Sequence, residues 1–448
     1  MAVGGENGFH PNGNSNSHNG ESNEADHQIS YIPLSYTSQD SNGSALRLVL
    51  AIRPKWEDAA SNIEFVRFTD GITNTLLKAV NKRPGLSQEE VDNEAILLRA
   101  YGNGTDLIID RHRETQNHEL LMKHGLAPEL LARFENGMMY RFIQGSVTHP
   151  EDLRKPNIYK AVARRLAEWH AVVPCIPGRT GHSRKNSKVD GHAGPSSNLG
   201  EAEFQKAIDC VAPGKRPPNV WTVMQKWIFA LPTETETQRA RQAELQKELT
   251  FLVSDLSQRP GLGVNALVFA HCDLLSGNVI VVPPKQQQGI TNGNGTKAAE
   301  TVVTFIDYEY ATPSPAAFDI ANHFAEWGGF DCDYSVLPTR AQRREFIADY
   351  IHAYFAKLPP ASLSTAVDES AEAKKLFAEV DYFRGLPGFY WGIWALIQAT
   401  ISQIDFDYAT YAETRLGEYW AWRGEVSGER ERSGKEMPLR ERRWAQEE

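Results

Sequence analysis

The side chains best suited to chemistry in this chain lie in the run HCDLLSGN at residues 271–278 and in the run IDYE at residues 306–309. Phosphoryl transfer needs an acceptor that orients a hydroxyl nucleophile, and one or two Mg²⁺ ions that bridge the phosphates. Asp273, on a loop after an apolar strand, can accept the hydroxyl proton. Asn278 and Asp307 can then hold the metal. The pattern HxDxxxxN, followed by a hairpin and IDxE, therefore predicts phosphoryl-transfer chemistry.

A further acid, Glu309, follows Asp307 by two residues in what reads as a strand. Side chains two apart on a strand project from one face, so Glu309 is expected to contact a second metal or to orient the first. Each piece is weak alone, because a loop aspartate is usually a cap or a turn former. The combination is what favours a catalytic role over a structural one.

A phosphotransferase also needs a cation that contacts the phosphates. In a two-lobed enzyme, this cation is held by an acid from the helix of the smaller lobe. Arg99, in a predicted strand, can supply the cation, and Glu114, at the start of the predicted helix, can supply the acid. Without the other motifs, an ordinary surface ion pair would explain both residues. Thr73 and Asn74 lie at a hairpin bend where a phosphate-covering loop is expected, although such turns are common.

Two nucleotide-binding signatures are set aside. The run GLGVNA at residues 261–266 matches a dinucleotide fingerprint, but it precedes a strand instead of opening a helix. No GxxxxGK[ST] motif occurs in the sequence, which excludes a P-loop enzyme.

Composition narrows the class of protein. The net charge of −10 and the pI near 5.8 argue against a nucleic-acid partner and suit a cationic substrate. The four cysteines include no CxxC pair, which fits a reducing compartment. The N-terminus has no apolar core of a signal peptide, and no run reaches the roughly 18 apolar residues that cross a bilayer. We therefore expect a cytoplasmic protein with no transmembrane segment.

The coarse pattern predicts two lobes between two tails. A tail at 1–44, rich in Gly, Asn, Ser and His, is expected to be disordered, and a charged tail at 424–448 to be mobile. The first lobe, 45–146, is predicted to contain a strand at 45–54, a hairpin at 61–80, strands at 94–102 and 105–110, a helix at 113–125 and a hairpin at 133–145.

The second lobe, 147–423, is predicted to be mostly helical. Amphipathic helices are expected at 157–173, 220–231 and 239–256. Polar insertions near 175–200 and 283–300 have no reason to pack, and the second of them is expected to be the long loop of a hairpin between 266–282 and 302–311.

Seven motifs, in order, give the chain a specific resemblance to the choline/ethanolamine kinase family, and more closely to its ethanolamine branch. The similarity runs from about Thr69 to Trp420 and comprises TDGITN, ILLRAYG, APELLARFENGMMYRFIQG, HCDLLSGNVI, FIDYEYA, FDIANHFAEW and FYWGIWALIQATIS. The resemblance implies a kinase-like α/β (α+β) fold, with a small β-rich N-lobe that binds the nucleotide and a large, mostly helical C-lobe. It also implies ATP and Mg²⁺ as cofactors.

The resemblance assigns roles to single residues. Asp273 would be the catalytic base, Asn278 and Asp307 metal ligands, and Arg99 the counterpart of the phosphate-binding lysine of protein kinases. Asp319 would brace the catalytic loop, in which His271 is the other supporting residue. The acceptor pocket would be formed by Glu326, Trp391, Trp394, Phe406 and Tyr411. From the residues alone, Trp391 and Trp394 on one helix face would be assigned to core packing. A bound ammonium favours the pocket instead, because it suits aromatic faces and a carboxylate.

The expected reaction is transfer of the γ-phosphate of ATP to the hydroxyl of ethanolamine, the first step towards phosphatidylethanolamine. The DxDYS run at 331–335, which could add acceptors for ammonium N–H groups, and Leu274-Leu275 resemble the ethanolamine branch. Choline kinase, or one enzyme for both substrates, is the nearest alternative. A protein kinase is disfavoured, since Cys272 replaces the usual arginine, and an inactive scaffold is disfavoured by the intact acidic set. An aminoglycoside-type phosphotransferase gives no reason for the tryptophan helix. The oligomeric state, a homodimer included, is left open.

Overall fold

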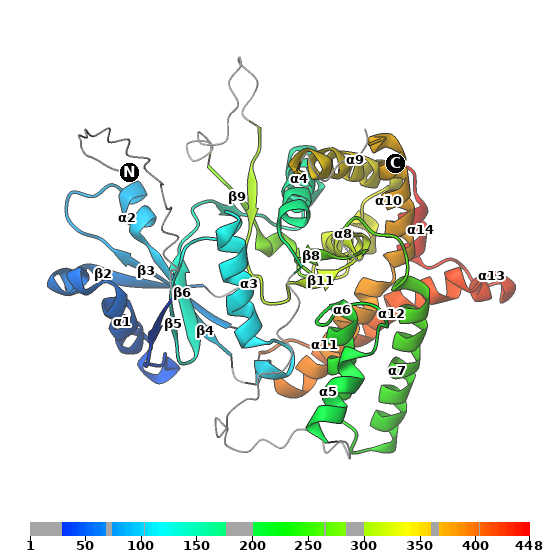
Figure 1. Ribbon diagram of the computed structural model, residues 1–448, viewed down its shortest axis with the longest axis horizontal. Helices are drawn as coiled ribbons and strands as arrows, with labels where there is room; N and C mark the ends of the chain where they lie inside the picture. Colours follow the sequence, from blue (N-terminus) through cyan, green and yellow to red (C-terminus); the bar gives the residue numbers. More distant parts are fainter. Residues whose placement is uncertain are drawn as a thin grey trace, which may run out of the picture.

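The computed structural model describes residues 29–68, 74–102, 104–175, 200–263, 266–283, 300–359, 367–402 and 404–448. They form two lobes, a smaller one built around a sheet and a larger one built mainly from helices (Figure 1). The two-lobed α/β arrangement expected from the sequence, with a small β-rich lobe and a large helical one, is therefore confirmed.

The N-lobe sheet has six strands in the order β1-β5-β6-β4-β3-β2. Only β1 and β5 are parallel, and the other neighbours are antiparallel. The strands are β1 (Ser30–Ile32), β2 (Ile63–Phe68), β3 (Asn74–Asn81), β4 (Ile96–Tyr101), β5 (Leu130–Phe134) and β6 (Gly137–Arg141). Both predicted hairpins are present, as β2–β3 and β5–β6.

Three helices accompany this sheet: α1 (Ser41–Ile52), α2 (Gln88–Glu94) and α3 (Arg111–Lys123). Helix α3 is the predicted helix, and it ends before Gly125, whose φ of 69° only glycine adopts without strain. Two predictions are wrong. Residues 45–54 form most of α1 instead of a strand, because Ala45, Leu48 and Val49 recur at helical spacing and are buried. Residues 105–110 begin as a short 3₁₀ turn, not a strand.

The predicted N-terminal boundary at residue 45 is also too late. Before it, β1 pairs with β5, and Tyr36 is buried against the N-lobe core. The amide of Asn136 fastens this segment, since it accepts from Tyr36 N at 2.9 Å and donates to Tyr36 O at 2.9 Å. The rest of the predicted tail, residues 1–28, lies outside the described residues.

The C-lobe core lies between helices. Helix α4 packs on α9 and α11 on α12, and α8 lies inside the lobe with every residue buried. The helices are α4 (Pro156–Val172), α5 (Glu201–Asp209), α6 (Val220–Phe229), α7 (Glu236–Leu256), α8 (Ala316–Ala325), α9 (Arg340–Lys357), α10 (Glu369–Phe383), α11 (Leu386–Ile401) and α12 (Tyr408–Val426). The three predicted amphipathic helices correspond to α4, α6 and α7.

Two small sheets lie in the C-lobe near its junction with the N-lobe (Figure 1). One is ordered β10-β9-β7, and the other pairs β11 with β8. Their strands are β7 (Ser146–Val147), β8 (Val268–Ala270), β9 (Val279–Val281), β10 (Val303–Phe305) and β11 (Thr312–Ser314). The loop between β8 and β9 carries the HCDLLSGN run, and the turn between β10 and β11 carries IDYE. Most of the two predicted insertions lies outside the described residues.

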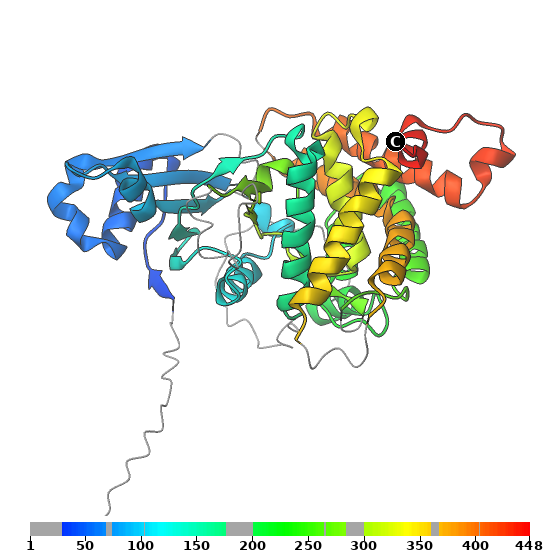
Figure 2. The same cartoon turned by 90° about the horizontal axis from the view of Figure 1, so that it is seen from above.

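The C-terminal segment is ordered, contrary to the prediction of a mobile tail after residue 423. Helix α12 runs to Val426, and α13 (Glu429–Arg432) and α14 (Leu439–Ala445) follow it. Helix α14 lies along the side of the C-lobe that faces away from the N-lobe (Figure 2). The indole of Trp444 is buried there against Phe324, which explains why this charged segment is held.

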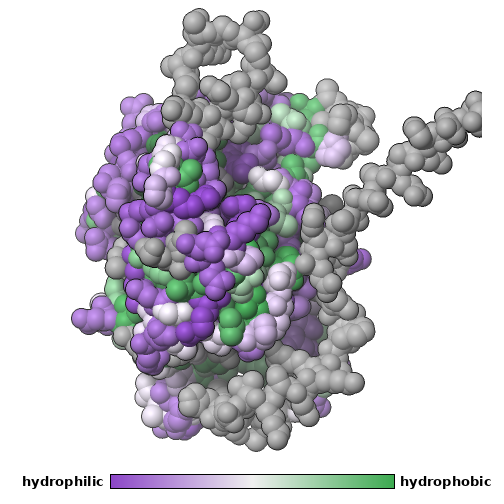
Figure 3. Space-filling model, turned by 90° about the vertical axis from the view of Figure 1, so that its left-hand side faces the viewer, coloured by the Kyte–Doolittle hydropathy of each residue, from purple (hydrophilic) through white to green (hydrophobic). Residues whose placement is uncertain are grey.

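The outer end of the N-lobe is mainly hydrophilic, with hydrophobic residues visible as smaller patches (Figure 3). In the part of the chain that the structure describes, no helix combines the length and the apolar character needed to cross a membrane.

Candidate active site

The loop after β8 is held by one buried carboxylate from α8. Asp319 Oδ2 accepts the backbone N–H of His271 at 2.9 Å, and Oδ1 accepts that of Cys272 at 2.8 Å. His170 Nε2 lies 2.9 Å from Asp319 Oδ2. Although burial opposes ionisation, these hydrogen bonds and the charge interaction with His170 keep the pKa of Asp319 below its usual value. Asp319 is therefore an ionised brace for this loop.

This brace holds a backbone conformation that the sequence does not favour. Cys272 has a φ of 63°, in the left-handed region that costs a residue with a side chain about 1–3 kcal/mol. Its carbonyl oxygen accepts from Asn322 Nδ2 at 2.9 Å, so both of its backbone polar groups are fixed by side chains of α8. The turn presents the next residue, Asp273, away from the strand.

Asp273 and Asn278 are brought together by the loop. Asn278 Nδ2 donates to the carbonyl oxygen of Asp273 at 2.7 Å and to its Oδ2 at 3.1 Å. Burial raises the pKa of Asp273 well above its usual value, and the charges of Asp307, Glu326 and Glu309 raise it further. The carboxyl group of Asp273 is therefore within electrostatic reach of three acids that are far from it in the sequence.

Asp307 lies after the end of β10, in a turn, and its φ of 64° is again left-handed. The prediction that Asp307 and Glu309 project from one face of a strand is therefore wrong in its geometry. The two acids nevertheless converge, since both form ion pairs with Arg99. Aspartate tolerates the left-handed region better than most residues, which suits it to this turn.

Arg99 of β4 is the centre of a buried charge cluster. Its Nη1 lies 2.8 Å from Asp307 Oδ1, its Nε lies 3.3 Å from Glu114 Oε1, and its Nη2 pairs with Glu309. Arg111 Nη1 adds ion pairs to Glu114 at 2.9 Å and to Glu309 at 3.1 Å. Three carboxylates thus face two guanidinium groups, so the cluster keeps one excess negative charge when all are ionised.

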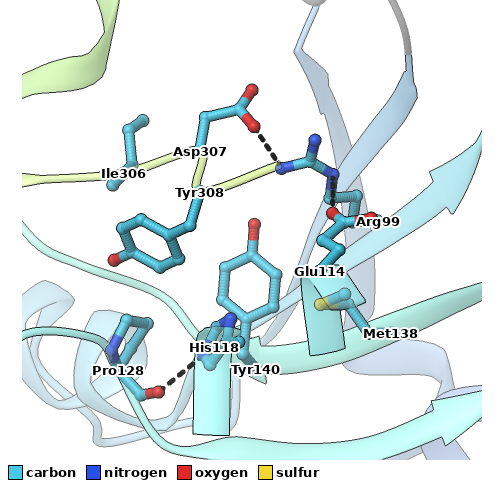
Figure 4. Close-up of a pocket in the computed structure, with 9 residues that line it drawn as sticks. All are labelled: Arg99, Glu114, His118, Pro128, Met138, Tyr140, Ile306, Asp307 and Tyr308. Carbon is cyan, nitrogen blue, oxygen red and sulfur yellow. Dashed lines mark hydrogen bonds and ion pairs between the residues drawn. The ribbon is translucent and has the colours of Figure 1, made fainter. Parts of the chain in front are cut away.

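Aromatic side chains close the site behind this cluster. A cavity of about 20 Å³ is lined by Arg99, Glu114, His118, Pro128, Met138, Tyr140, Ile306, Asp307 and Tyr308. Figure 4 shows the hydroxyl of Tyr140 directed towards Asp307 and the guanidinium of Arg99, with His118 at the base of the group. A volume near that of one water molecule is too small for a nucleotide or an acceptor. This side of the cluster is therefore packed.

The pKa of Asp307 is raised to about 6 by burial, which outweighs the opposing effect of Arg99. Burial also raises the pKa of Glu114. Burial lowers the pKa of His271 to about 4, and its Nε2 lies 3.0 Å from the carbonyl oxygen of Ile306. His271 is thus a neutral link between the two loops, not a proton donor or acceptor at neutral pH.

The predicted acceptor aromatics lie close to the loop. Trp391 and Trp394 on α11 meet edge to face, with centroids 5.4 Å apart. Trp391 Nε1 donates to Asn322 Oδ1 at 2.8 Å, and Trp394 Nε1 donates to the hydroxyl of Tyr310 at 2.8 Å. Because Asn322 also holds Cys272, this tryptophan pair is tied directly to the loop that carries Asp273.

Glu326, at the end of α8, is buried and already has a cation partner. Arg415 Nη2 of α12 lies 3.1 Å from Glu326 Oε1. Burial raises the pKa of Glu326, and Arg415 opposes that effect. The sequence did not reveal this arginine. An ammonium group at Glu326 would therefore share its carboxylate with Arg415.

Two other predicted pocket residues, Phe406 and Tyr411, lie together, with ring centroids 5.6 Å apart. Phe330 touches both of them, and Phe330 and Phe406 are 44% and 39% exposed. The suggestion that Asp331 and Asp333 add acceptors is not supported, because both are exposed at the surface. Asp333 instead caps a 3₁₀ turn, accepting from the backbone N–H of Ser335 at 2.9 Å.

The phosphate-loop prediction is answered only in part. Thr73 lies outside the described residues. Asn74, the first residue of β3, donates from Nδ2 to Glu309 Oε2 at 3.0 Å. Asn74 therefore joins the Arg99 cluster through its acid.

Several site residues were missed by the sequence analysis, and some left a signal. Asn322 and His323 were missed, although they follow the predicted residue Asp319 by three and four positions in an apolar stretch. With Glu326, directly after α8, they put four polar side chains on one face. His323 Nδ1 lies 2.8 Å from the carbonyl oxygen of Leu274. By contrast, His170, Arg111 and Arg415 come from other helices and stand in no recognisable motif.

Oxygen donors suited to Mg²⁺ are available at Asp307, Glu309 and Asn278. Mg²⁺ is usually held by one or two carboxylates together with substrate phosphates. Within the described ranges, no group of three or more His, Cys, Asp or Glu side chains is arranged to hold a metal ion. The excess negative charge of the Arg99 cluster, next to Asp273, fits a divalent cation that arrives with a nucleotide.

Comparison with known proteins gives consistent results along the chain. The family model described as choline/ethanolamine kinase matches residues 65–420. Ethanolamine kinase 1 of Mus musculus is 33% identical over 386 residues, covering 86% of this chain and 90% of its own. A probable ethanolamine kinase of Nematostella vectensis is also 33% identical, covering 88% and 96%. Among solved structures, an ethanolamine kinase of Plasmodium vivax has a TM-score of 0.61 at 23% identity, covering 86% of this chain and 89% of its own.

Proposed function

Because this chain belongs to the choline/ethanolamine kinase family, we propose that it transfers the γ-phosphate of ATP to the hydroxyl of ethanolamine. The observation that carries the choice of substrate is similarity to ethanolamine kinases over nearly the whole chain. The intact set of Asp273, Asn278, Asp307 and Arg99 supports an active enzyme. Choline, or both amino alcohols, is the alternative substrate.

Asp273 is the residue proposed to orient the hydroxyl and accept its proton. Its buried carboxylate, held by Asn278 at 3.1 Å, supports that role, since a positioned base contributes about 10²–10⁴-fold to the rate. Mg²⁺, when bound with ATP, neutralises charge on the phosphates. Asp307 and Asn278 would hold the ion, and Glu309 would contact or orient it.

Arg99 is proposed to contact the phosphates while Glu114 keeps its guanidinium in place. Three carboxylates hold Arg99 on separate nitrogens, Glu114 and Glu309 being buried and Asp307 partly exposed, and this fixes the orientation of its planar guanidinium group. An anionic nucleotide adds negative charge beside Asp307. Arg99 would offset part of that charge, and a metal ion held by Asp307 and Asn278 would offset the rest.

Substrate binding is proposed to prepare the base. The charges of Asp307, Glu326 and Glu309 help raise the pKa of Asp273. A metal ion at Asp307 and an ammonium group at Glu326 would each cancel one of these charges. The pKa of Asp273 would then fall, so that its carboxylate is ionised when both substrates are present.

The acceptor is proposed to lie among Glu326, Trp391, Trp394, Phe406 and Tyr411. The ammonium group of ethanolamine has three N–H donors and is bound well by a carboxylate. The trimethylammonium group of choline has none and is bound well by aromatic faces. The site contains both kinds of group, and the carboxylate of Glu326 is shared with Arg415.

The test is a coupled ADP-release assay with ethanolamine, with choline and with no acceptor, at saturating ATP and Mg²⁺. We expect kcat/KM for ethanolamine to exceed that for choline at least tenfold. Equal values would make the protein a kinase for both substrates, and a higher value for choline would reverse the assignment. Acceptor-independent ADP release alone would contradict the proposed function.

A further inference from the structure

A row of buried charges joins the predicted acceptor carboxylate to the C-terminal helix. Arg415 pairs with Glu326 at 3.1 Å and with Glu418 at 3.6 Å. Arg440 Nε of α14 lies 3.6 Å from Glu418 Oε2, and its Nη1 lies 3.2 Å from Glu441 Oε1. Negative and positive charges alternate along the row, from Glu326 through Arg415, Glu418 and Arg440 to Glu441. Every neighbour of a charge in the row therefore has the opposite sign.

This row is in the interior of the protein. Glu326, Arg415, Glu418, Arg440 and Glu441 are each no more than 6% exposed. A buried charge that loses its partner is costly, because little water is present to replace the lost interaction. The position of each side chain in the row is therefore coupled to the positions of its neighbours.

Helix α14 is itself fixed by further contacts, with α9 and with the C-terminal end of α10. Trp444 Nε1 donates to Asp381 Oδ1 at 2.7 Å, and Arg343 Nη2 donates to the carbonyl oxygen of Trp444 at 2.9 Å. Arg384 Nη2 pairs with Glu441 at 2.9 Å. In Figure 1, α14 lies beside α10, on the far side of the C-lobe from the nucleotide-binding lobe. Arg440 thus contacts Glu418 from a helix that several other contacts hold in place.

We propose that α14 positions the acceptor carboxylate, acting from Arg440 through Glu418 and Arg415 to Glu326. The C-terminal segment then sets the affinity for the amino alcohol although it contacts neither substrate. This inference rests on the proposed function, because it assigns Glu326 to the ammonium group. Arg440 is a positioning residue in this scheme, not a catalytic one.

The physical reason is competition for Arg415. With Arg440 present, Glu418 has a second cation, and Arg415 is free to reach Glu326. Without Arg440, Glu418 is left with Arg415 as its cation and draws that guanidinium towards itself. Glu326 then loses the partner that holds its orientation and offsets its burial. Burial already raises the pKa of Glu326, and the loss favours its neutral form, which binds ammonium poorly.

The test is Arg440→Met, which keeps the apolar stem and removes the charge. Networks of this kind change binding by about 2- to 30-fold. We expect KM for ethanolamine to rise within that range, while KM for ATP and kcat change less than twofold. The matched control is Arg442→Met on the same helix, because Arg442 is exposed and its ion pair with Glu436, at 2.6 Å, lies at the surface. The control should leave every constant within twofold of the parent.

Two further variants keep the proposal falsifiable if Arg440→Met folds poorly. Arg440→Lys keeps the positive charge but lacks the planar guanidinium group, and it should raise KM for ethanolamine less than Arg440→Met does. Combining Arg440→Met with Glu326→Gln should add little to Glu326→Gln alone, because both act on one carboxylate. Fully additive effects in this cycle would overturn the proposal.

Other outcomes are equally decisive. If Arg440 acted only through its electric field, removing its positive charge would strengthen the attraction of the site for ammonium. A lower KM for ethanolamine in Arg440→Met would therefore overturn the proposal that Arg440 positions Glu326. An unchanged KM, or parallel losses for ATP and ethanolamine with a lower Tm, would do so as well. If the parent protein shows no ethanolamine-dependent turnover, the proposed function and this inference fall together. If the parent is active and KM in Arg440→Met is unchanged, only this inference fails.

Discussion

Asp319→Asn is the substitution that tests the architecture of the site most severely. The side chain keeps its shape, but one oxygen becomes an NH₂ group that cannot accept. Oδ1 faces the N–H of Cys272 and Oδ2 faces that of His271, so in either orientation the amide leaves one buried donor unpaired. A lost hydrogen bond to a charged group costs roughly 1.5–3 kcal/mol, and an unpaired buried donor roughly 1–3 kcal/mol.

We therefore expect Asp319→Asn to lower the free energy of unfolding by about 3 kcal/mol, and Tm by about 3–6 °C in a protein of this size. The larger effect should be on turnover. Cys272 at a φ of 63° would no longer be held, and a shift of about 1 Å at the base costs on the order of 10²-fold in rate.

The measurements are thermal unfolding and steady-state kinetics, with Asp349→Asn as the matched control. Asp349 Oδ2 pairs with Arg164 Nη1 at 2.9 Å on the partly exposed face of α9, a contact worth at most about 1 kcal/mol. The control should keep its turnover. The reasoning is refuted if Asp319→Asn retains kcat within threefold of the parent, or if both variants behave alike.

The other predictions concern the metal, pH and the acceptor. Asp307→Asn should nearly abolish turnover and raise the Mg²⁺ concentration needed for half-activity, with Glu309→Gln milder; Mg²⁺ titrations that match the parent would make both acids structural. The pKa of Asp307 is raised to about 6, so its carboxylate becomes protonated as the pH falls through that value. At low Mg²⁺, kcat/KM should therefore decrease below about pH 6, and this decrease should move to lower pH as the Mg²⁺ concentration increases. A pH profile that is flat down to pH 5 would contradict this prediction. Trp391→Leu removes an aromatic face worth roughly 0.5–2 kcal/mol and should raise KM for choline at least as much as KM for ethanolamine. Trp391→Phe keeps an aromatic ring and should raise both KM values less than Trp391→Leu does. Equal effects of the two substitutions would exclude a contact between Trp391 and the ammonium group.

Much of the site could be predicted from the sequence because its parts lie in short local patterns. The HCDLLSGN run fixes Asp273 and Asn278 on one loop, and the apolar strands around it fix where that loop emerges. Arg99 and Glu114 were expected to meet because a phosphotransferase needs a cation on the phosphates that is held by an acid from the helix of the small lobe. Their roles in phosphate binding and the cytoplasmic location stay predictions, and the oligomeric state stays open.

The rest depended on contacts that no local pattern encodes. Asp307 and Glu309 converge through a left-handed turn and a shared arginine, whereas the sequence suggested a regular strand. The charged residues of α14 were interpreted as part of a mobile tail, although Arg440 is buried against Glu418, 22 positions earlier in the chain. Charge and burial are opposing signals in a sequence, and only the partner, which is distant in the chain, decides between them.

The central claim is that Asp273 directs transfer of a phosphoryl group to the oxygen of ethanolamine. The most direct test is ³¹P NMR of a reaction with ATP, Mg²⁺ and ethanolamine, run with the parent protein and with Asp273→Asn. The account predicts a phosphomonoester signal of phosphoethanolamine with the parent, and a rate about 10²–10⁴-fold lower with the variant, which should still bind ATP. Inorganic phosphate as the only product, or a variant that forms the ester at the rate of the parent, would contradict it.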